Sequence, residues 1–539
     1  LMDRRSFLVT AAVGAASGIA GGALYWQGQE ISASVFYPGR AEGHWLRDGQ
    51  ALPPPSSVRR VDVAILGSGI AGLSAAWRLA KSGHEDFVVV TGPEWQGNAA
   101  GGRSGDLRFP TGAHYLPLPA PESTHVREML ADFKVILEEP FSERPYYDER
   151  FIVHAPAERL LYRGQWQEGQ VPGTNSAEQE RFFHEMDRLR DLRGSDGRRI
   201  FVVPLVLSSQ DPQWTALDRL SFKTWLEQAG YRGEALHWYC DYCCRDDYGA
   251  GYDKVSAWAG LHYFCSRGGQ ARNAERGALL TWPEGLSFLA DRLAARAGLG
   301  HDGVNGRRIN ATAYEVRPTR QGVEIKLFTL GANGVTTSSI LARRAICAMP
   351  LHVAARIIPD LQDSGFHAQK HFPEQAPWLV SNFLMKSFPT ELAGAPLAWD
   401  NVVYRTPSLG YVVSTHQDFR VGPPERMAFT AYHALSDRSP LEARRWLQNA
   451  SSDELLSLAA ADLKLAYGWK LAPSVERVDI TVRAHAMAIP HPGFLSNPGI
   501  AALRTATSPL LFAHADLSGY SVFEEAAWWG CRAAEKALA

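Results

Sequence analysis

The chain has almost no excess of charge of one sign, and it has no long apolar run after its first 26 residues. Its net charge of −2 over 539 residues gives no reason to expect nucleic acid or an anionic membrane surface as a partner. No internal repeat or low-complexity tract is present. The 45% apolar and 21% charged residues are typical of a globular protein, and the length allows two or more domains with sizeable cores.

Cysteine is also scarce, and its spacing argues against a zinc site. A C-x-x-C is present at Cys240 and Cys243, but no second pair follows at a zinc-binding distance. We therefore expect no metal and interpret the cysteines as buried free thiols, with a disulfide as the alternative in an oxidising compartment. The six are Cys240, Cys243, Cys244, Cys265, Cys347 and Cys531.

The most informative stretch runs from Val61 to Gly72 and reads VDVAILGSGIAG. A β-branched apolar run enters a turn of the form G-x-G-x-x-G, a helical pattern follows at once, and Phe87–Val90 predicts a second strand. The first glycine makes the turn, the second lets a pyrophosphate approach the backbone, and the third packs helix against strand. The sequence therefore predicts a dinucleotide site at the helix N-terminus. Its expected residues are Gly67, Ser68, Gly69, Ile70, Ala71 and Gly72.

The sequence offers two alternatives for the group that holds the adenosine ribose. An acidic residue is expected about twenty positions after such a turn. Here the second strand ends at Thr91-Gly92-Pro93, and the nearest carboxylate is Glu94. Either Glu94 binds the ribose from the loop, or Thr91 and backbone groups do so.

Five further motifs follow in a fixed order. They are Gly101-Gly102-Arg103, Gly112-Ala113-His114-Tyr115, Trp282-Pro283-Glu284-Gly285, Ala345–Pro350 and Leu511–Asp516. Together they resemble the flavoprotein superfamily of amine oxidases, phytoene desaturases and protoporphyrinogen oxidases, from about residue 58 to the C-terminus. The resemblance implies FAD as the cofactor. It also implies an α/β fold, in which a Rossmann-like FAD-binding domain assembled from separated segments is joined to an α+β substrate domain.

The resemblance assigns cofactor contacts outside the first turn to Arg103, Gly112, Ala113, His114 and Asp516. Arg103 would lie against the cofactor, where one guanidinium offsets phosphate charge. Gly112 and Ala113 would bring backbone close to the isoalloxazine, because glycine allows close approach. Asp516 would hydrogen-bond the ribityl or phosphate region. An alternative register uses Gly97-Asn98 as the second glycine motif.

The same resemblance divides the chain into interleaved pieces. We expect the FAD-binding domain at 58–120, 276–355 and 495–539, and the substrate domain at 121–275 and 356–494. Ahead of them lie an export or anchor segment at 1–26 and a linker at 27–57. Gly331–Gly334 separates two extended runs and predicts a hairpin turn.

The N-terminus predicts the location of the protein. Arg4-Arg5-Ser6-Phe7-Leu8 precedes an apolar run of small residues that ends near Trp26, which resembles a twin-arginine export signal. That route carries folded proteins and suits a flavoprotein, so we expect a periplasmic location. No clean cleavage site is present and the run is just long enough to span a bilayer, so removal and membrane anchoring both stay open.

An aromatic and acidic stretch at Trp238–Tyr248, continued at Trp258–Phe264, points to the substrate. Aromatic faces and carboxylates attract a cation, which favours an amine, polyamines included, oxidised by hydride transfer to flavin N5. The alternative is a buried pair of helices whose aromatics fill the core. In that case Asp241, Asp246 and Asp247 would cap helices or pair with Arg245.

Catalytic residues are not identified by these patterns. Amine oxidases of the superfamily often place a lysine near N5, but the matching strand here offers Ser381 or Asn382, with Lys386 several residues later. The aromatic position before the last helix falls on Tyr520 or Val522. A desaturase-like enzyme acting on a hydrophobic substrate, and a non-catalytic flavin-bearing membrane accessory protein, therefore stay as alternatives.

Overall fold

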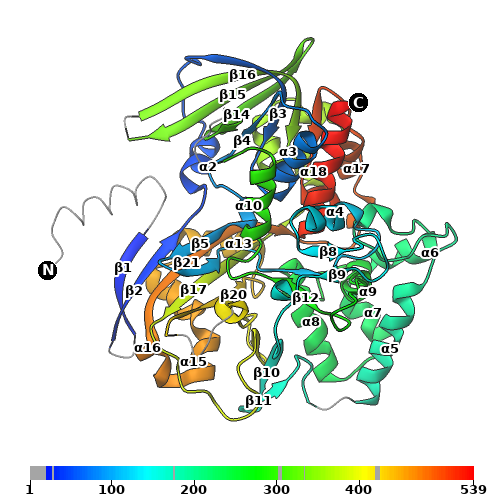
Figure 1. Ribbon diagram of the computed structural model, residues 1–539, viewed down its shortest axis with the longest axis vertical. Coiled ribbons are helices and arrows are strands. Elements are labelled where there is room, and N and C mark those ends of the chain that lie inside the picture. The colour runs from blue at the N-terminus through cyan, green and yellow to red at the C-terminus, as the bar shows by residue number, and fades with distance from the viewer. Residues whose placement is uncertain (1–19, 27–28, 174–175, 301–305, 333, 419–424) are drawn as a thin grey trace.

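The computed structural model describes residues 20–26, 29–173, 176–300, 306–332, 334–418 and 425–539. The paired arginines of the expected export signal lie outside these residues. Two units are visible in Figure 1, a Rossmann-like unit above and a unit built on a larger sheet below. Among the described residues, no helix combines the length and the apolar character that a bilayer span requires.

The upper unit contains a seven-stranded sheet in the order β13-β4-β3-β16-β15-β14, with β22 also paired to β16. Its central strands are parallel, and β14 to β16 form an antiparallel meander. Gly331 pairs with Gly334 across the predicted hairpin. The strands are β3 (Val58–Leu66), β4 (Phe87–Val90), β13 (Arg308–Ile309), β14 (Thr312–Thr319), β15 (Gly322–Gly331), β16 (Gly334–Cys347) and β22 (Leu510–Phe512).

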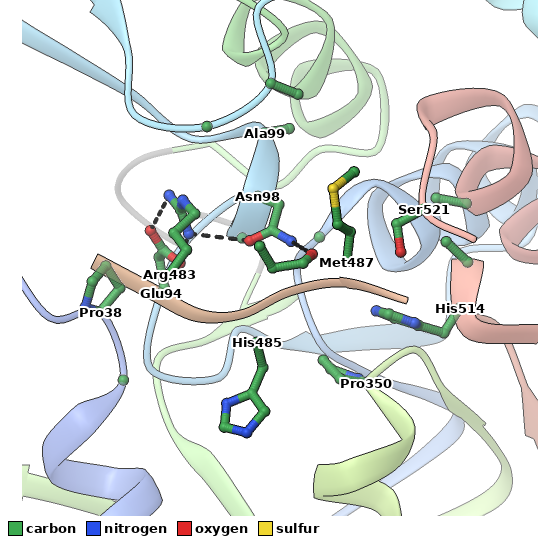
Figure 2. Close-up of a pocket in the computed structure, with 18 of the residues that line it drawn as sticks. Pro38, Glu94, Asn98, Ala99, Pro350, Arg483, His485, Met487, His514 and Ser521 are labelled. Carbon is green, nitrogen blue, oxygen red and sulfur yellow. Dashed lines mark hydrogen bonds and ion pairs between the residues drawn. The ribbon is translucent and has the colours of Figure 1, made fainter. Parts of the chain in front are cut away.

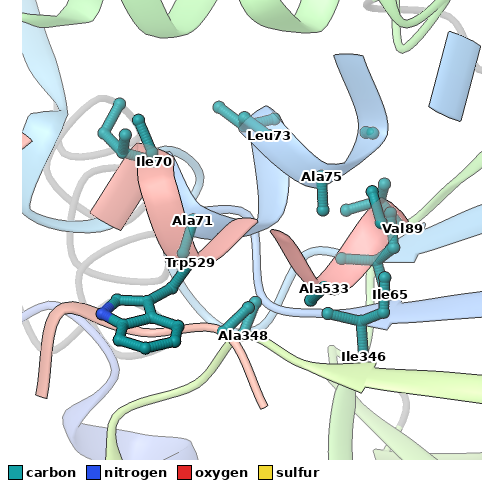
Figure 3. Packing of buried hydrophobic residues seen from close by; sticks show 14 of the residues in the cluster. Ile65, Ile70, Ala71, Leu73, Ala75, Val89, Ile346, Ala348, Trp529 and Ala533 are labelled. Atoms are coloured by element: carbon teal, nitrogen blue, oxygen red, sulfur yellow. The ribbon is translucent and has the colours of Figure 1, made fainter. Parts of the chain in front are cut away.

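The strand β4 is apolar and buried along its whole length, and β3 is apolar and buried over Val63–Leu66, where it pairs with β4. On one side α3 and α18 lie against each other and against the strands (Figure 3). There Ile65, Val89 and Ile346 meet Ala75 and Ala533 in one buried cluster. The helices of this unit are α3 (Ile70–Lys81), α4 (Thr124–Asp132), α10 (Ser287–Arg296), α11 (Leu351–Ile357), α17 (Pro498–Thr505) and α18 (Phe523–Leu538).

The lower unit is built on a nine-stranded sheet in the order β1-β2-β21-β17-β20-β19-β18-β10-β11. Side chains alternate along β17, so Val380 enters the core on one face and Leu379 the core on the other. The strands are β1 (Ala20–Trp26), β2 (Gln29–Phe36), β10 (Glu158–Tyr162), β11 (Gln165–Glu168), β17 (Gln375–Met385), β18 (Asp400–Val403), β19 (Tyr411–Val413), β20 (Met427–Ala434) and β21 (Val475–Ala488).

Helices cover both faces of this sheet. One face carries α5 (Ala177–Asp191), α7 (Phe222–Gln228), α8 (Glu234–Tyr248) and α9 (Ala257–Ser266). The other carries α13 (Pro440–Asn449), α14 (Ser452–Ala459), α15 (Ala461–Tyr467) and α16 (Leu471–Ser474). The aromatic stretch at Trp238–Tyr248 and Trp258–Phe264 forms α8 and α9, so the alternative prediction of a buried helical pair is confirmed. All six cysteines are free and buried.

Residues 29–47 belong to the fold, whereas the sequence predicted a linker over 27–57. β2 pairs in parallel with β21, and its alternate residues Ile31, Ala33 and Val35 are buried. Residues 20–26 of the expected export segment form β1, paired with β2. The helix α2 (Arg40–Arg47) follows and leads toward the Rossmann-like unit (Figure 1). The alternating pattern of β2 is short, and it is a weak signal beside the proline-rich residues 53–55 that indicate a linker.

Two predicted domain boundaries are also displaced. Val126 and Met129 of α4 are buried in the core of the Rossmann-like unit, together with Tyr147. Ile357 and Phe366 are buried in the same core. The FAD-domain pieces therefore extend past the predicted ends at 120 and 355, because α4 packs on α18 and α11 packs on β14.

Candidate active site

A cavity of about 900 Å³ is lined by both units. The Rossmann-like unit contributes the β3–α3 turn, the end of β4 and the segment after β16. The other unit contributes β17, β20, β21 and the helices α8, α9 and α13. The helix α2 closes one side. The strand β21 crosses the cavity in Figure 2 and carries several of its side chains.

The glycine turn has the geometry that a phosphate requires. Gly67 has a φ of +113°, and a Cβ there would lie 2.7 Å from the carbonyl oxygen of Ala348. A Cβ on Gly72 would lie 1.9 Å from the oxygen of Gly67, so Gly72 serves helix–strand packing behind the cavity wall. A Cβ on Gly69 would meet nothing within 4 Å, because this glycine faces the cavity. Gly67 to Ala71 line the cavity, as predicted for a dinucleotide turn.

The N-terminus of α3 is open to the cavity. Its N-cap residue is Gly69, and no side chain caps the helix. The first N–H groups of a helix have no partner inside it, and they carry the positive end of the helix dipole. The backbone present here therefore fits a pyrophosphate.

The second glycine motif follows the alternative register. Gly97, Asn98 and Ala99 line the cavity, and Gly97 has a φ of +55°. Arg103 lies instead on the hairpin strand β5 (Gly101–Ser104), where its exposed side chain donates to the oxygen of Gly105 at 2.6 Å. The prediction that Arg103 lies in the cofactor site is therefore not supported. The backbone turn at Gly97, rather than the pair of glycines before Arg103, brings the chain to the cavity.

Glu94 lines the cavity, but its carboxylate is already engaged. Both of its oxygens accept from the Arg483 guanidinium, at 2.9 and 3.0 Å (Figure 2). Arg483 also donates to the oxygen of Thr111 at 2.7 Å and to Asn98 at 3.2 Å. This pair joins β21 to the loop after β4. Thr91 lines the cavity too, so both alternatives for the ribose stay predictions. Sequence reasoning missed Arg483, since no motif marks it.

The Gly112–His114 segment lines the cavity as predicted. A Cβ on Gly112 would lie 2.1 Å from the oxygen of Asn98, and the Ala113 N–H donates to that same oxygen. Gly285, with a φ of +63°, supports Ala113 from behind. The His114 ring stacks on Tyr432 at 4.4 Å, and burial lowers the pKa of His114 to about 3, so its ring is neutral at pH 7.

Asp516 lies behind the cavity wall rather than in the cavity. Its carboxylate accepts from the Leu351 N–H at 2.9 Å and from Gln375 at 3.1 Å. Burial acts to raise the pKa of Asp516, but His514 and the Leu351 N–H outweigh it, and the pKa falls to about 2. Asp516 thus joins α11, β17 and the C-terminal segment, while His514 and Ala515 line the cavity. The predicted contact with a ribityl or phosphate group is not supported.

Carboxyl groups gather at another part of the cavity, on α8 and α18. Asp247 pairs with Arg267, whereas Asp246 and Glu524 have no arginine or lysine of the described chain within salt-bridge distance. Burial, together with the neighbouring Asp247, raises the pKa of Asp246 to about 7. Burial also raises the pKa of Glu524 to about 7. Arg267 is the nearby guanidinium, and it acts to lower the pKa of both groups, but its salt bridge is made with Asp247. One arginine therefore faces three carboxyl groups in this region.

Aromatic side chains surround these carboxyl groups. Tyr115 contacts Asp246, and its pKa is raised by burial. His262 stacks on Trp258 and bonds the oxygen of Val202 at 2.9 Å, as a satisfied core histidine does. The aromatic residues that line the cavity here are Tyr115, His262, Trp378, Tyr432 and Tyr520.

No lysine lines the cavity among the residues that the structure describes. On β17 it is Trp378 and Val380 that reach the cavity, while Asn382 donates to the oxygen of Pro110 and Lys386 is exposed. Tyr520, one of the two alternatives for the aromatic position, lines the cavity; so does Val522, the other.

Comparisons with known proteins agree with this architecture. Residues 65–133 match the family model of an NAD(P)-binding Rossmann-like domain. No curated protein matches the chain. Among solved structures, putrescine oxidase bound to putrescine has a TM-score of 0.60 at 17% identity, covering 89% of this chain and 99% of that one. Cyclohexylamine oxidase from Brevibacterium oxydans IH-35A has the same TM-score and identity, covering 88% and 98%.

A fatty acid isomerase from P. acnes also matches, with a TM-score of 0.55, 15% identity and coverage of 88% and 97%. At such identities the likeness shows the fold alone. The chain therefore has the predicted α/β fold, with a Rossmann-like dinucleotide-binding domain that includes residues 65–133. The solved structures share the fold over most of the chain.

Proposed function

We propose that this protein is an FAD-dependent oxidoreductase that oxidises an amine. The observation that carries the proposal is a pair of carboxyl groups, half-buried Asp246 and buried Glu524, that have no salt bridge of their own in the described chain. They stand in the wall of a cavity that also opens onto the glycine turn. The turn suits a dinucleotide, and the carboxyl groups with their aromatic neighbours suit a cation.

The residues that would hold FAD are those of the β3–α3 turn and of the Gly97 and Gly112 segments. The open N-terminus of α3 would take the pyrophosphate. The close packing of Gly112 on Asn98 would present backbone rather than side chains to the flat ring system. When bound, the flavin supplies the hydride acceptor, and the protein orients the substrate and excludes water.

The carboxyl groups would bind and deprotonate the substrate. An ammonium group beside Asp246 or Glu524 would form the salt bridge that these carboxyl groups lack in the described chain, and the faces of Tyr432 and Trp378 would add attraction. A carboxyl with a pKa of about 7 can also take the proton that an ammonium must lose before its carbon gives up a hydride. The neutral His114 ring adds no competing charge.

The first test is the visible spectrum of the purified protein, before and after anaerobic addition of a mixture of polyamines. Flavin absorption that bleaches supports both the cofactor and the substrate class. Asp246→Asn and Glu524→Gln should each raise KM for the amine at least about tenfold, which corresponds to losing about 1.4 kcal/mol of binding. Asp241→Asn is the matched control on α8, since Asp241 pairs with Arg245 and does not line the cavity.

A second candidate function is a desaturase-like reaction on a hydrophobic substrate. The absence of lysine from the described cavity wall favours it. Flavin that bleaches with a lipid extract and stays oxidised with every amine would replace the first proposal by this one. Flavin that is inert to both would favour the non-catalytic accessory protein.

We also propose that the protein is exported by the twin-arginine route to the periplasm, either cleaved or held at the inner membrane. The support is the Arg4-Arg5 pair and the apolar run that follows it. Replacing both arginines by lysine should leave the protein in the cytoplasmic fraction. An unchanged distribution between fractions would contradict the proposal.

A further inference from the structure

The cavity has a cationic side that the cofactor-binding motif does not account for. The segment that follows the second glycine turn places Ala99 in the wall, and Arg103 faces away from it. Arg483 is neutralised by Glu94. Positive charge enters the cavity from three other elements, the helices α2, α11 and α13. The arginines concerned are Arg40, Arg47, Arg356, Arg444 and Arg445.

These arginines largely lack carboxylate partners. Arg47 pairs with Asp48, but in the described part of the chain no carboxylate lies within salt-bridge distance of the other four. Arg40 lies over the Tyr37 ring at 4.7 Å, and Arg444 donates to the backbone oxygen of Gln375 at 2.8 Å. Glu42 is the acid that α2 contributes to the same wall. The cationic side therefore has positive charge left to neutralise.

Contacts join the three helices into one region. Arg356 of α11 donates to the backbone oxygen of Arg47 on α2 at 3.4 Å. One turn earlier on α11, His352 stacks on His485 of β21 at 4.4 Å. Burial, with Arg444 and Arg356 nearby, lowers the pKa of His352 to about 4, so this ring is neutral at pH 7. Arg356 of α11 and Arg444 of α13 thus both lie near His352, and Arg444 lies near His485 as well.

The position of α2 connects this region to the nucleotide end of the cavity. Gly39, at the start of α2, packs against Pro93 just after β4; a Cβ on Gly39 would lie 3.0 Å from the Pro93 ring. Pro38 stands at the cavity beside Glu94 in Figure 2. The end of β4 is where a dinucleotide turn places the adenosine half of its ligand. The segment 29–47 therefore spans from the substrate-domain sheet to the nucleotide end.

We infer that Arg40, Arg356 and Arg444 form a phosphate-binding site on the nucleotide side of the cavity, closed by α2. This inference rests on the proposed dinucleotide function and names the residues that hold the ligand's phosphate charge. A dinucleotide carries two negative charges, and guanidinium groups neutralise phosphate with directed N–H donors. The open helix N-terminus supplies hydrogen bonds, while the three helices supply the net charge.

The distribution of charged side chains on the two sides of the cavity also fits an anionic dinucleotide bound together with a cationic substrate. Within the described chain, Arg40, Arg356, Arg444 and Arg445 stand without a salt bridge on the α2, α11 and α13 side. On α8 and α18, Asp246 and Glu524 share Arg267 with Asp247. An anionic dinucleotide on the first side and a cationic substrate on the second would neutralise both.

The test measures binding of ADP, FAD and FMN to cofactor-stripped full-length protein, by calorimetry at two salt concentrations. Arg444→Gln should weaken ADP and FAD binding about tenfold. Arg40→Gln and Arg356→Gln should each weaken it somewhat less, because these two side chains are exposed. The affinity for FMN, which carries one phosphate and no adenosine, should fall less in these variants. Arg444→Lys should recover part of the ADP affinity. Arg438→Gln is the control, since Arg438 pairs with Asp437 just before α13 and does not line the cavity.

Two outcomes separate this inference from the proposed function. Variants that bind ADP and FAD with wild-type affinity and wild-type salt dependence would overturn the phosphate site. A wild-type protein that binds ADP through these arginines but does not bind FAD would overturn the flavin proposal and leave the phosphate site standing. Melting temperatures of the ligand-free variants report whether any loss of binding comes from unfolding.

Discussion

At the scale of single residues, Gly69 separates the binding role of the turn from its structural role. Its φ of −69° and ψ of 179° are open to any residue, and a Cβ there would have no protein atom within 4 Å. Gly67 and Gly72, in contrast, are confined by the backbone around them. Within one motif, Gly67 and Gly72 are therefore required by backbone packing, whereas Gly69 is required only by the space that the ligand needs.

Gly69→Leu should remove the cofactor without unfolding the protein. The leucine would fill the space in front of the α3 N-terminus, and we expect at least about a 30-fold loss of FAD affinity, or about 2 kcal/mol. Flavin retained after gel filtration and the melting temperature of the stripped protein measure the two effects. Gly300→Leu is the control, because a Cβ there also meets nothing. A Gly69→Leu protein that stays yellow would contradict the placement of the site.

Asp246 should make the substrate-free protein less stable as pH rises. Burial raises the pKa of its carboxyl from the usual 3.8 to about 7, so between these values the folded state holds a proton that the unfolded state has lost. The loss of folding stability caused by ionising Asp246 is absent below about pH 4 and complete above about pH 7. Asp246→Asn should therefore stabilise the protein at about pH 8, by up to about 4 kcal/mol, and leave it unchanged at about pH 4.

Urea unfolding of the substrate-free protein at the two pH values measures this effect. Asp241→Asn on the same helix should act in the opposite direction at the higher pH, because Asp241 pairs with Arg245 and accepts from the Tyr252 N–H. Equal stability of wild type and Asp246→Asn at the higher pH would show that this carboxyl is already compensated in the fold.

At the scale of elements, the crossing of α3 and α18 depends on Gly530. A Cβ at this position would lie 2.1 Å from the oxygen of Ala71 on α3. The close approach brings Trp529 and Ala533 against the buried face of α3 (Figure 3). The C-terminal helix is thereby held beside the turn that opens onto the cavity.

Gly530→Ala should destabilise the protein by about 1–3 kcal/mol, the usual cost of overpacking a core. The sign of the stability change is informative. In a helix with free space around the position, alanine is favoured over glycine by about 1 kcal/mol, so Gly530→Ala would then stabilise the protein. Arg532→Ala, on the exposed side of α18, is the control and should change little. A gain in stability from Gly530→Ala, in chemical denaturation, would mean that the helices are further apart.

Prediction succeeded at this scale where a pattern was long or carried glycines. β3, α3 and the β15–β16 hairpin lie where their patterns placed them. β2 and α2 were missed, because a short run of alternating residues carries little signal without knowledge of the strand that pairs with it. β21 supplies that partner from more than 400 residues away in the sequence.

At the scale of the whole molecule, the chain crosses between the units several times. It runs from β2 to β3, from β7 (Tyr115–Pro117) to β10, from α9 to β13, from β16 to β17, and from β21 to β22. The cavity between the units is lined by residues from nearly every one of these pieces. Neither unit is a continuous segment, so we expect the two to unfold together.

Calorimetry should accordingly show one transition, and FAD at about 100 times its Kd should stabilise the folded protein by about 2.7 kcal/mol. The same addition to Gly69→Leu should shift the transition far less. Two resolved transitions, of which FAD moves one alone, would mean that the units fold independently of each other.

The sequence by itself determined the α/β class and the dinucleotide turn, and it left the buried aromatic helix pair as one of two alternatives. Each depends on neighbouring residues, since hydrophobic periodicity and glycine geometry act over a few positions. Tertiary structure alone decided that Glu94 is bound by Arg483, that Asp516 lies behind the wall, and that Gly97 rather than Arg103 reaches the cavity. Those outcomes depend on which distant side chain a group meets, because burial and charge pairing are set by residues brought together only on folding.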